Sequence, residues 1–357
     1  MSGLDHVIAA ETCLSEVDGL NGRLVICGYR LDELAGRTSF EAVLALLYAD
    51  LLGENEQAIR TQLGQARLRA YAEIAHIDET LLALSVTEGL RALMARLPDG
   101  EDRSTALLLT AAPAVFVPAL IRRKAGQQAI GPDPTLGHAA DMLAMLTGTA
   151  PQPEAIAALD TYLVTVSDHG LNASTFAARV VASTRAGYTS AVLAALGALK
   201  GPLHGGAPGP VLDMLDAVGT PENAQSWLSA ELARGERLMG FGHRIYRVRD
   251  PRADALKAAL RRIGAAGGMN ADRLALAEAV ERDALALLHR AKPDRKLETN
   301  VEFFTALLLE ALGFPRDAFT GVFATGRVGG WIAHAHEQVA NGRLIRPQSK
   351  YVGPKAA

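Results

Sequence analysis

Cysteine is scarce in this sequence: Cys13 and Cys27 are the only two among 357 residues. Neither lies in a metal-binding or redox spacing, so the chain fits a reducing compartment. The N-terminus also lacks a basic segment followed by an apolar one, and Asp5 and Glu11 would interrupt a signal peptide. We therefore predict no export signal and a cytoplasmic location.

An excess of either charge is absent as well. The sequence has 36 Lys and Arg against 39 Asp and Glu, a formal net charge of −3. This balance lacks the basic footprint by which nucleic-acid binders neutralise phosphates, so we predict no nucleic-acid partner. Hydrophobic residues make up 49% and charged residues 21%, which is typical of a globular protein.

Long uncharged runs are missing with one exception, residues 105–121, which are followed by Arg122, Arg123 and Lys124. The run is slightly short for a membrane span, and it contains Pro113 and Pro118. The alternatives are one membrane span or a buried, kinked helix. We predict the buried helix and no membrane partner.

Aromatic residues make up only 5%, whereas Ala and Leu are abundant, which favours helices over sheets. We predict an all-α fold, and at this length two domains are expected. Residues 18–29 pair a glycine-rich turn with a short apolar run, which predicts a small strand or hairpin that we expect to be peripheral to the chemistry. Helical spacing of apolar residues occurs at 40–52, 80–97, 154–166, 175–185, 189–200, 252–263, 271–289 and 301–312.

Three breaks in the helical pattern frame a middle region. Gly and Pro occupy seven of the ten positions from Gly201 to Pro210, which must interrupt any helix. Further breaks are predicted at Lys292–Asn300 and at Gly313–Gly321. No internal repeat of 20 to 50 residues is visible, so a solenoid is not expected.

Two histidines each stand beside glycines in such loops. His204 follows Leu203 and precedes Gly205, and His243 follows Gly242. Small neighbours leave an imidazole facing open space, as a catalytic histidine requires, although a single histidine of this kind is more often a turn residue. Because two such histidines occur, the pattern favours a functional role for both.

A basic segment adjoins His243. Between Arg234 and Arg262, nine basic residues face three acidic ones. A solvated helix face is the alternative, but the pattern favours an anion-binding segment, because the planar arginine side chain donates paired hydrogen bonds to carboxylates and phosphates.

Other histidines carry less information. Asp168 and His169 precede Asn172 to Thr175, a polar cluster that predicts a helix cap. His334 and His336 do not share a helix face, and no thiolate or carboxylate completes a metal set with them, so we predict structural use and no metal site.

Taken in order, these segments resemble the citrate synthase family over nearly the whole chain. The matching motifs are Gly201–Ala207, Gly240–Tyr246, Asp250–Ala253, Asn300–Phe303, Asp168–His169 with Asn172–Thr175, and Gly326–Arg327 with Gly330–His334. The N-terminal Ala9–Thr12 and the C-terminal Arg346–Ser349 resemble the short bacterial form.

The resemblance implies condensation of an acyl thioester with a 2-oxo acid. His204 would hydrogen-bond the thioester oxygen, and His243 would polarise the keto carbonyl and protonate the alkoxide. The base would be Glu302. The remaining implied assignments are oxaloacetate binding by His169, Arg252, Arg327 and, from a partner subunit, Arg346; and coenzyme A binding by Gly240, Gly242, Arg247, Arg295 and Lys296.

The resemblance also implies a homodimer that needs no metal or redox cofactor and takes a coenzyme A thioester as substrate. A large helical domain would comprise residues 1–204 and 310–357, and a smaller inserted helical domain would comprise 205–309. Closure of the small domain would complete the site and exclude water.

One departure from the family's pattern concerns the base. The family's Asn-Val-Asp motif ends here in Glu302, and Thr299 stands where proline is common. A shift of about 1 Å in a carboxylate can cost about 10²-fold in rate, yet the intrinsic pKa of Glu and Asp differs by only about 0.4. Three readings follow: a citrate synthase, a 2-methylcitrate synthase or other condensing enzyme of an acyl-CoA and a 2-oxo acid, and a weakly active or non-catalytic ligand-binding paralogue.

Overall fold

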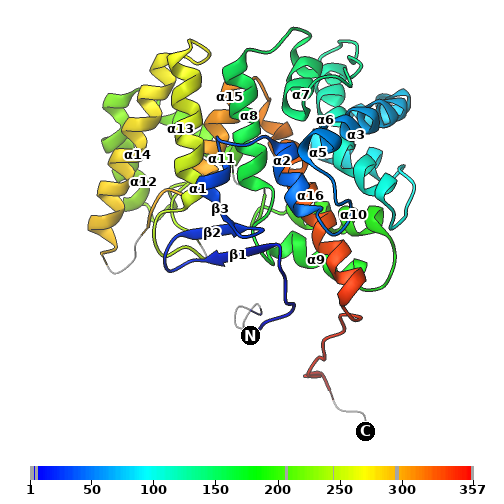
Figure 1. The fold of residues 1–357 in the computed structure, drawn as a ribbon. Helices are drawn as coiled ribbons and strands as arrows, with labels where there is room; N and C mark the ends of the chain where they lie inside the picture. Colours follow the sequence, from blue (N-terminus) through cyan, green and yellow to red (C-terminus); the bar gives the residue numbers. More distant parts are fainter. Residues whose placement is uncertain (1–3, 5–6, 206–207, 244, 294–296, 355–357) are drawn as a thin grey trace.

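The computed structural model describes residues 4, 7–205, 208–243, 245–293 and 297–354. The chain is mostly helical, as the composition predicted, with one small sheet (Figure 1). The α-helices of the described residues are α1 (Leu31–Leu34), α2 (Phe40–Leu47), α3 (Glu56–Tyr71), α4 (Glu79–Leu82), α5 (Val86–Met94), α6 (Arg103–Lys124), α7 (His138–Thr147), α8 (Pro153–Val166), α9 (Ala173–Ala182), α10 (Tyr188–Leu199), α11 (Pro208–Val218), α12 (Ala224–Ala233), α13 (Pro251–Ala265), α14 (Ala271–Ala291), α15 (Val301–Ala311) and α16 (Phe319–Asn341).

The predicted helices are present, with one division. The run at 80–97 is split into α4 and α5, because Ser85 starts a new helix. The Ser85 hydroxyl accepts a hydrogen bond from the Glu88 amide, and the Glu88 carboxylate accepts one from the Ser85 amide. This reciprocal cap satisfies backbone donors that would otherwise lack partners.

The uncharged run at 105–121 lies inside α6, which is the one described helix long and apolar enough to cross a membrane. Every residue from Thr105 to Leu120 is buried against the rest of the protein. The helix contains both Pro113 and Pro118. Its burial confirms the prediction of a core helix, since its apolar surface is already covered by protein.

The break predicted at Gly313–Gly321 is shorter than expected, because α16 begins at Phe319 and runs through four glycines. These glycines permit close approach of helices. A Cβ on Gly326 would lie 2.5 Å from Val166 Cγ2, and one on Gly330 would lie 2.3 Å from the Ser167 carbonyl oxygen. Glycine therefore brings α16 directly against the end of α8, where the Asp168–His169 segment begins.

The helices of residues 205–309 form one side of the molecule, with α12, α13 and α14 on the left in Figure 1. Helix α13 packs against both α15 and α8, and α11 packs against α15. On the other side, α6 contacts α3, α5, α7 and α16. Residues 205–309 thus meet the rest of the chain where α13 packs on α8, and also where Arg316 pairs with Asp213 and Asp216 of α11.

A three-stranded antiparallel sheet confirms the predicted hairpin. Its strands are β1 (Ser15–Asp18), β2 (Arg23–Ile26) and β3 (Tyr29–Arg30), in the order β1-β2-β3. Ser15 pairs with Ile26, and Asp18 pairs with Arg23. The expectation that this hairpin is peripheral is wrong, because it contacts both the segment after His169 and the segment after His243.

Candidate active site

The predicted site residues come from separate helix ends and loops that meet in one cluster. His169 follows α8, Arg252 lies in the first turn of α13, Glu302 lies in the first turn of α15, and Arg327 lies within α16. The rings of His169 and His243 are 5.9 Å apart between centroids. The charges of Arg252 and Arg327 act on His204 and on Glu302 alike. The structure therefore brings both loop histidines, the glutamate and two arginines together.

His243 is held by the backbone that follows it. Its Nδ1 accepts hydrogen bonds from the amides of Ile245 and Tyr246, each at 3.0 Å. Burial, followed by the nearby positive charge of Arg252, lowers the pKa of His243 to about 4, so the ring is neutral at physiological pH. Since Nδ1 accepts, the ring proton resides on Nε2, which lies 3.2 Å from an Arg252 nitrogen. Both nitrogens are then donors, and they can share one acceptor oxygen of a ligand.

His169 is paired with a residue that sequence reasoning did not assign. Its Nε2 lies 3.1 Å from the hydroxyl of Tyr246, and that ring also packs on His243 at 4.8 Å between centroids. Burial, with the charges of Arg252 and Arg327, holds the pKa of His169 well below its usual value. A signal was present in the sequence, since Tyr246 stands three residues after His243 in the same motif.

Arg252 is fixed by Asp250, a second residue that carried no assignment. Its Nε and a terminal nitrogen donate to the two Asp250 oxygens at 3.0 and 2.8 Å. Asp250 also accepts from the Arg252 amide at the start of α13 and from the Val301 amide at the start of α15. One carboxylate therefore orients the guanidinium and joins the two helices that present Arg252 and Glu302.

Arg327 differs from every other buried arginine of the described residues. Arg67 pairs with Asp141, Arg179 with Glu337, and Arg252 with Asp250, whereas Arg327 has no carboxylate partner among the residues described. It is only 1% exposed and donates to the Val166 carbonyl oxygen. Burial, with repulsion from Arg252, lowers its pKa to about 10 against the opposing charge of Asp168. Among the described residues, Arg252 is paired with a carboxylate and Arg327 is not. The two buried guanidiniums therefore carry a surplus positive charge that suits an anion.

His204 is oriented by Ser174, a residue of the predicted helix cap and of a matching family motif to which the sequence assigned no role in the site. The cap is confirmed, since Asn172 Oδ1 accepts from the amides of Ser174 and Thr175. The Ser174 hydroxyl also lies 2.8 Å from His204 Nε2, and it accepts a hydrogen bond from Trp331 at 3.1 Å. Burial, then Arg327 and Arg252, lowers the pKa of His204 to about 4, which keeps the ring neutral.

Glu302 lies in a loop and helix start that are firmly held. Asn300 caps α15 by accepting from the Glu302 amide, and its own amide and side-chain nitrogen donate to the carbonyls of Gly240 and Gly242. Within the described part of the chain, Glu302 Oε2 is buried and has no hydrogen-bond partner. Burial raises the pKa of Glu302 to about 7, although Arg252 opposes the shift. A carboxyl poised near neutral pH is suited to act as a general base.

The glycines before His243 are required by the backbone. Gly240 and Gly242 have φ of +85° and +81°, and a Cβ on Gly240 would lie 2.8 Å from Phe303 Cβ. The carbonyls of Gly240 and Gly242 accept hydrogen bonds from Asn300, which holds the Glu302 loop beside the His243 loop. Arg247 is exposed at the end of the same loop. Arg295 and Lys296 lie outside the described residues.

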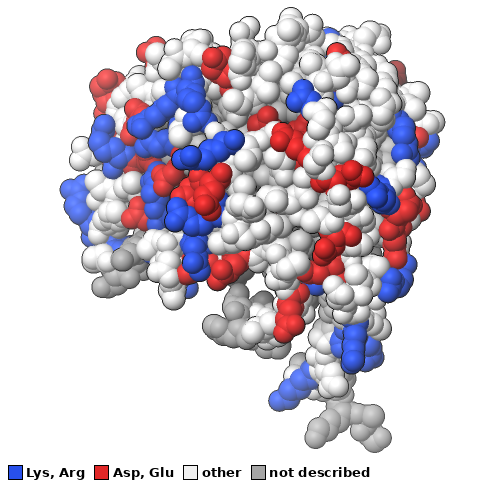
Figure 2. Space-filling model, viewed as in Figure 1, with Lys and Arg blue, Asp and Glu red and all other residues white. Residues whose placement is uncertain are grey.

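The basic surplus of residues 234–262 is largely balanced by acids of neighbouring segments, which corrects its reading as one anion-binding segment. Arg249 pairs with Asp254 and Glu281, Lys257 with Glu281, and Arg261 with Glu278. Figure 2 shows Lys and Arg intermixed with Asp and Glu on the side of α13 and α14. Within the surplus, Arg252 is the residue that the structure places in the buried cluster.

Arg346 is not brought to the cluster by its own chain. It is exposed on the segment after α16, which extends away from the body of the molecule (Figure 1). The backbone nearby is anchored by the Ile345 amide, which donates to the Ser183 hydroxyl.

The C-terminal histidines have structural partners, as predicted. His334 Nε2 lies 3.1 Å from Asp168 Oδ2, and its Nδ1 lies 3.0 Å from an Arg179 nitrogen. Burial opposes ionisation of Asp168, but His334, Ser15 and Arg327 together hold the pKa of this carboxyl below its usual value. His336 contacts the Tyr188 hydroxyl at 2.9 Å. The hydrogen bonds from Arg179 through His334 to Asp168 therefore support the residue next to His169.

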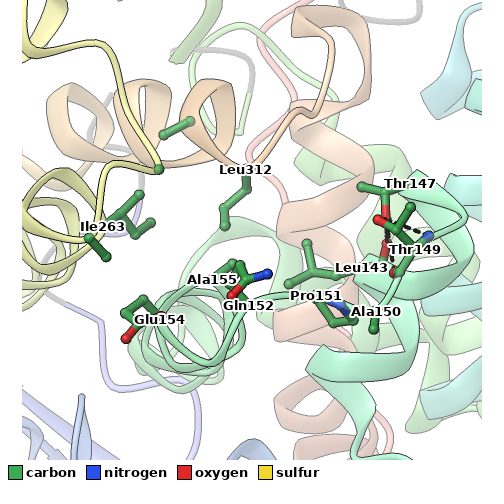
Figure 3. A pocket seen from close by; sticks show the side chains of 13 residues that line it. Leu143, Thr147, Thr149, Ala150, Pro151, Gln152, Glu154, Ala155, Ile263 and Leu312 are labelled. Carbon is green, nitrogen blue, oxygen red and sulfur yellow. Dashed lines mark hydrogen bonds between the residues drawn. The ribbon is translucent and has the colours of Figure 1, made fainter.

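A separate cavity of about 350 Å³ lies between α7 and α8 on one side and α13 and α15 on the other (Figure 3). Its walls are mostly apolar, with Leu143, Ile263 and Leu312 among them, and Thr147, Gln152 and Glu154 supply polar atoms. None of the predicted site residues lines it.

Comparison with known proteins gives one consistent result. The family described as "Citrate synthase, C-terminal domain" matches residues 3–348. The chain is 38% identical to the citrate synthase of Haloferax volcanii over 99% of this chain and 96% of that protein. It is 36% identical to the 2-methylcitrate synthase of Mycobacterium tuberculosis over 98% of this chain and 90% of that protein. Among solved structures, the citrate synthase of Thermoplasma acidophilum in ternary complex with carboxymethyl coenzyme A and oxaloacetate matches with a TM-score of 0.86 and 28% identity. The match covers 99% of this chain and 96% of that one.

Proposed function

This chain belongs to the citrate synthase family, and from that premise we propose how its buried residues divide the work of the reaction. The enzyme condenses acetyl-CoA with oxaloacetate and hydrolyses the resulting thioester to citrate and coenzyme A. It is an acyltransferase that converts the acyl group to an alkyl group, and the acyl-CoA is a substrate rather than a resident cofactor. The observation that carries the proposal is the buried Arg327, which has no carboxylate partner among the described residues, beside a glutamate whose pKa is raised to about 7.

Oxaloacetate binds where the two buried guanidiniums meet His169 and His243, whose rings pack edge to face. Arg327, which lacks a carboxylate of its own, takes one substrate carboxylate, and Arg252 with His169 contributes to holding the other. The Nε2–H of His243 then donates to the keto oxygen and polarises the carbonyl. When the alkoxide forms, this proton neutralises it, and the adjacent Arg252 cation eases the loss of the proton from the ring.

The acyl half is activated by His204 and Glu302. Glu302 removes a proton from the methyl group of acetyl-CoA, and the electron pair released moves towards the thioester oxygen. With the Ser174 hydroxyl donating to Nε2 of His204, the ring proton lies on Nδ1, which donates to the thioester oxygen. The enolate carbon then attacks the keto carbon to form the new carbon–carbon bond. Water finally cleaves the thioester, and coenzyme A leaves.

Coenzyme A lies along the loop from Gly240 to Arg247. Asn300 binds the carbonyls of Gly240 and Gly242, so this loop brings the thioester arm next to the helix start that carries Glu302. The exposed Arg247 contacts a phosphate of the cofactor moiety, and Arg295 or Lys296 supplies a further cation.

The active enzyme is a homodimer in which the extended C-terminal segment reaches the partner. Arg346 then completes the oxaloacetate site of the other subunit, which accounts for its exposure on a segment that extends from its own chain. Residues 1–204 and 310–357 form the large domain and 205–309 the small one, which closes over the substrates. The protein acts in the cytoplasm, where Cys13 and Cys27 remain as free thiols.

The choice of acyl donor tests this function against its alternatives. We expect release of free thiol with oxaloacetate and acetyl-CoA, at a kcat/KM at least about tenfold above that with propionyl-CoA, since one methylene is worth about 10- to 200-fold in a fitted pocket. Thiol titration of both reactions measures the ratio. A preference for propionyl-CoA would identify a 2-methylcitrate synthase. No release with either donor would support a different acyl substrate or the non-catalytic reading.

The pH dependence should report Glu302. Its pKa is raised to about 7, and the base must be ionised, so kcat/KM should fall about tenfold per pH unit below pH 7 and level off above it. His204 and His243, with pKa lowered to about 4, stay neutral over this range and add no step near neutrality. Initial rates between pH 5.5 and 8.5 give the profile. A flat profile down to pH 5.5 would exclude a base with this pKa.

A further inference from the structure

The hairpin of β1 and β2 touches the segment that follows His169. The Ser15 hydroxyl accepts a hydrogen bond of 2.9 Å from the Gly170 amide, the residue next to His169. Gly170 has a φ of +59°, and a Cβ there would lie 3.2 Å from Val17 Cγ2. Strand β1 therefore packs on the His169 turn as well as bonding to it.

The turn of the same hairpin touches the segment that follows His243. The Gly19 carbonyl oxygen accepts a hydrogen bond of 2.8 Å from the Arg247 amide. The approach is close, because a Cβ on Gly19 would lie 2.4 Å from the Ile245 carbonyl oxygen. Gly22 approaches Val248 in the same way, with 2.8 Å between a Cβ there and Val248 Cγ2.

The turn itself is well fixed. Asp18 accepts hydrogen bonds from the amides of Leu20 and Asn21, both at 3.1 Å, and from the Asn21 side chain at 2.8 Å. These bonds hold the four-residue connection between β1 and β2 in one shape. A displacement at one end of the hairpin is therefore transmitted to the other.

The hairpin contacts the chain on both sides of the hydrogen bond between His169 and Tyr246, which joins the loop after α8 to the loop that carries His243. Tyr246 lies beside the Ile245–Gly19 and Arg247–Gly19 contacts, its hydroxyl reaches His169, and its amide donates to His243. Ser15 anchors the other side at Gly170. Ser15, Gly19, Tyr246 and His169 thus form a closed circuit of contacts across the two loops.

We propose that the hairpin of residues 15–26 sets the separation of His169 and His243, so that Ser15 and Gly19 are positioning residues for the 2-oxo acid. The inference rests on the proposed assignment of these histidines to oxaloacetate. Because the hairpin touches neither His204 nor Glu302 in the described contacts, its effect falls on the oxo-acid half of the reaction. A displacement of about 1 Å at such a site can cost up to about 10²-fold.

Two variants and two controls test the proposal. Ser15→Ala removes the acceptor for the Gly170 amide without adding volume, and Ser15→Thr restores the hydroxyl. Gly19→Ala pushes on Ile245 at a position where no positive φ is involved, and Gly197→Ala is its matched control, because a Cβ on Gly197 would meet nothing within 4 Å. Each protein is measured for oxaloacetate affinity by calorimetry and for the ¹³C shift of the bound keto carbon.

We expect Ser15→Ala and Gly19→Ala to bind oxaloacetate about tenfold more weakly and to shift the keto-carbon signal back towards its value in free oxaloacetate. Ser15→Thr and Gly197→Ala should match the wild type. A scaffold role alone would lower the melting temperature and leave the carbon shift of bound ligand unchanged. Wild-type affinity and shift in both variants would overturn the proposal. If Arg327→Met also left affinity unchanged, the failure would lie in the site assignment and not in the hairpin.

Discussion

Glu302→Gln is expected to lower kcat by about 10³-fold while oxaloacetate affinity stays within about threefold of wild type. The substitution keeps the shape of the side chain but removes its ability to take a proton, and general-base catalysis is worth about 10² to 10⁴ in rate. The oxaloacetate ligands Arg252 and Arg327 are untouched by it. Steady-state rates of thiol release and calorimetric titration with oxaloacetate give the two quantities.

Two further variants make this result interpretable. Glu298→Gln changes a carboxylate of the same loop that contacts His289, and it should leave kcat near wild type. Glu302→Asp should lower kcat by about 10- to 100-fold, because the Asn300 cap and the Asn300–Gly240 hydrogen bond keep the backbone from advancing to compensate for the shorter side chain. A rise in turnover for Glu302→Asp would show that the loop is shaped for aspartate. A wild-type rate for Glu302→Gln would remove Glu302 from its role.

Arg327→Met should weaken oxaloacetate binding by about 10² to 10³-fold and at the same time raise the free energy of unfolding of the free enzyme. Arg327 is a buried cation without a carboxylate partner in the described chain, and burial lowers its pKa to about 10. Its charge is therefore unfavourable until a substrate carboxylate arrives. Methionine fills similar space without the charge. Calorimetry with oxaloacetate and chemical denaturation without it measure the two effects.

Arg67→Met is the matched control for that variant. Arg67 is as deeply buried, but it pairs with Asp141 at 2.5 Å and lies in α3, outside the site. Removing it strands a buried carboxylate, so the enzyme should lose about 3 to 5 kcal/mol of stability. The ligand affinity of the folded protein should not change. Opposite signs of the stability change for Arg327 and Arg67 are the distinctive result, and a loss of stability in both would contradict an unpaired cation in the free site.

Much of the helical pattern and the central site residues could be predicted from the sequence. Helical periodicity located most of α8 to α10 and α13 to α15, because their apolar positions repeat locally. Glycine flanks singled out His204 and His243, and the family resemblance added Arg252, Arg327 and Glu302. The structure brings these five residues into one cluster.

What the sequence did not reveal depends on contacts between distant segments. Ser174 and His204 are 30 residues apart, and Asp250 and Val301 are 51 apart, so no local pattern links either pair. The glycines of α16 were read partly as a break, because local propensity disfavours them in a helix, but close packing on α8 requires them. The hairpin was judged peripheral for the same reason, since Ser15 and Gly170 are 155 residues apart.

The central claim is that Glu302 removes the methyl proton of acetyl-CoA in a citrate synthase site. Uptake of deuterium from D₂O into the acetyl methyl group isolates this step, when malate occupies the oxo-acid site and offers no keto carbon for attack. We predict uptake by the wild type and by His243→Ala, which loses the group for the keto oxygen but keeps His204 and Glu302, and uptake at least about 10³-fold slower by Glu302→Gln. Uptake by Glu302→Gln at the wild-type rate would contradict the claim.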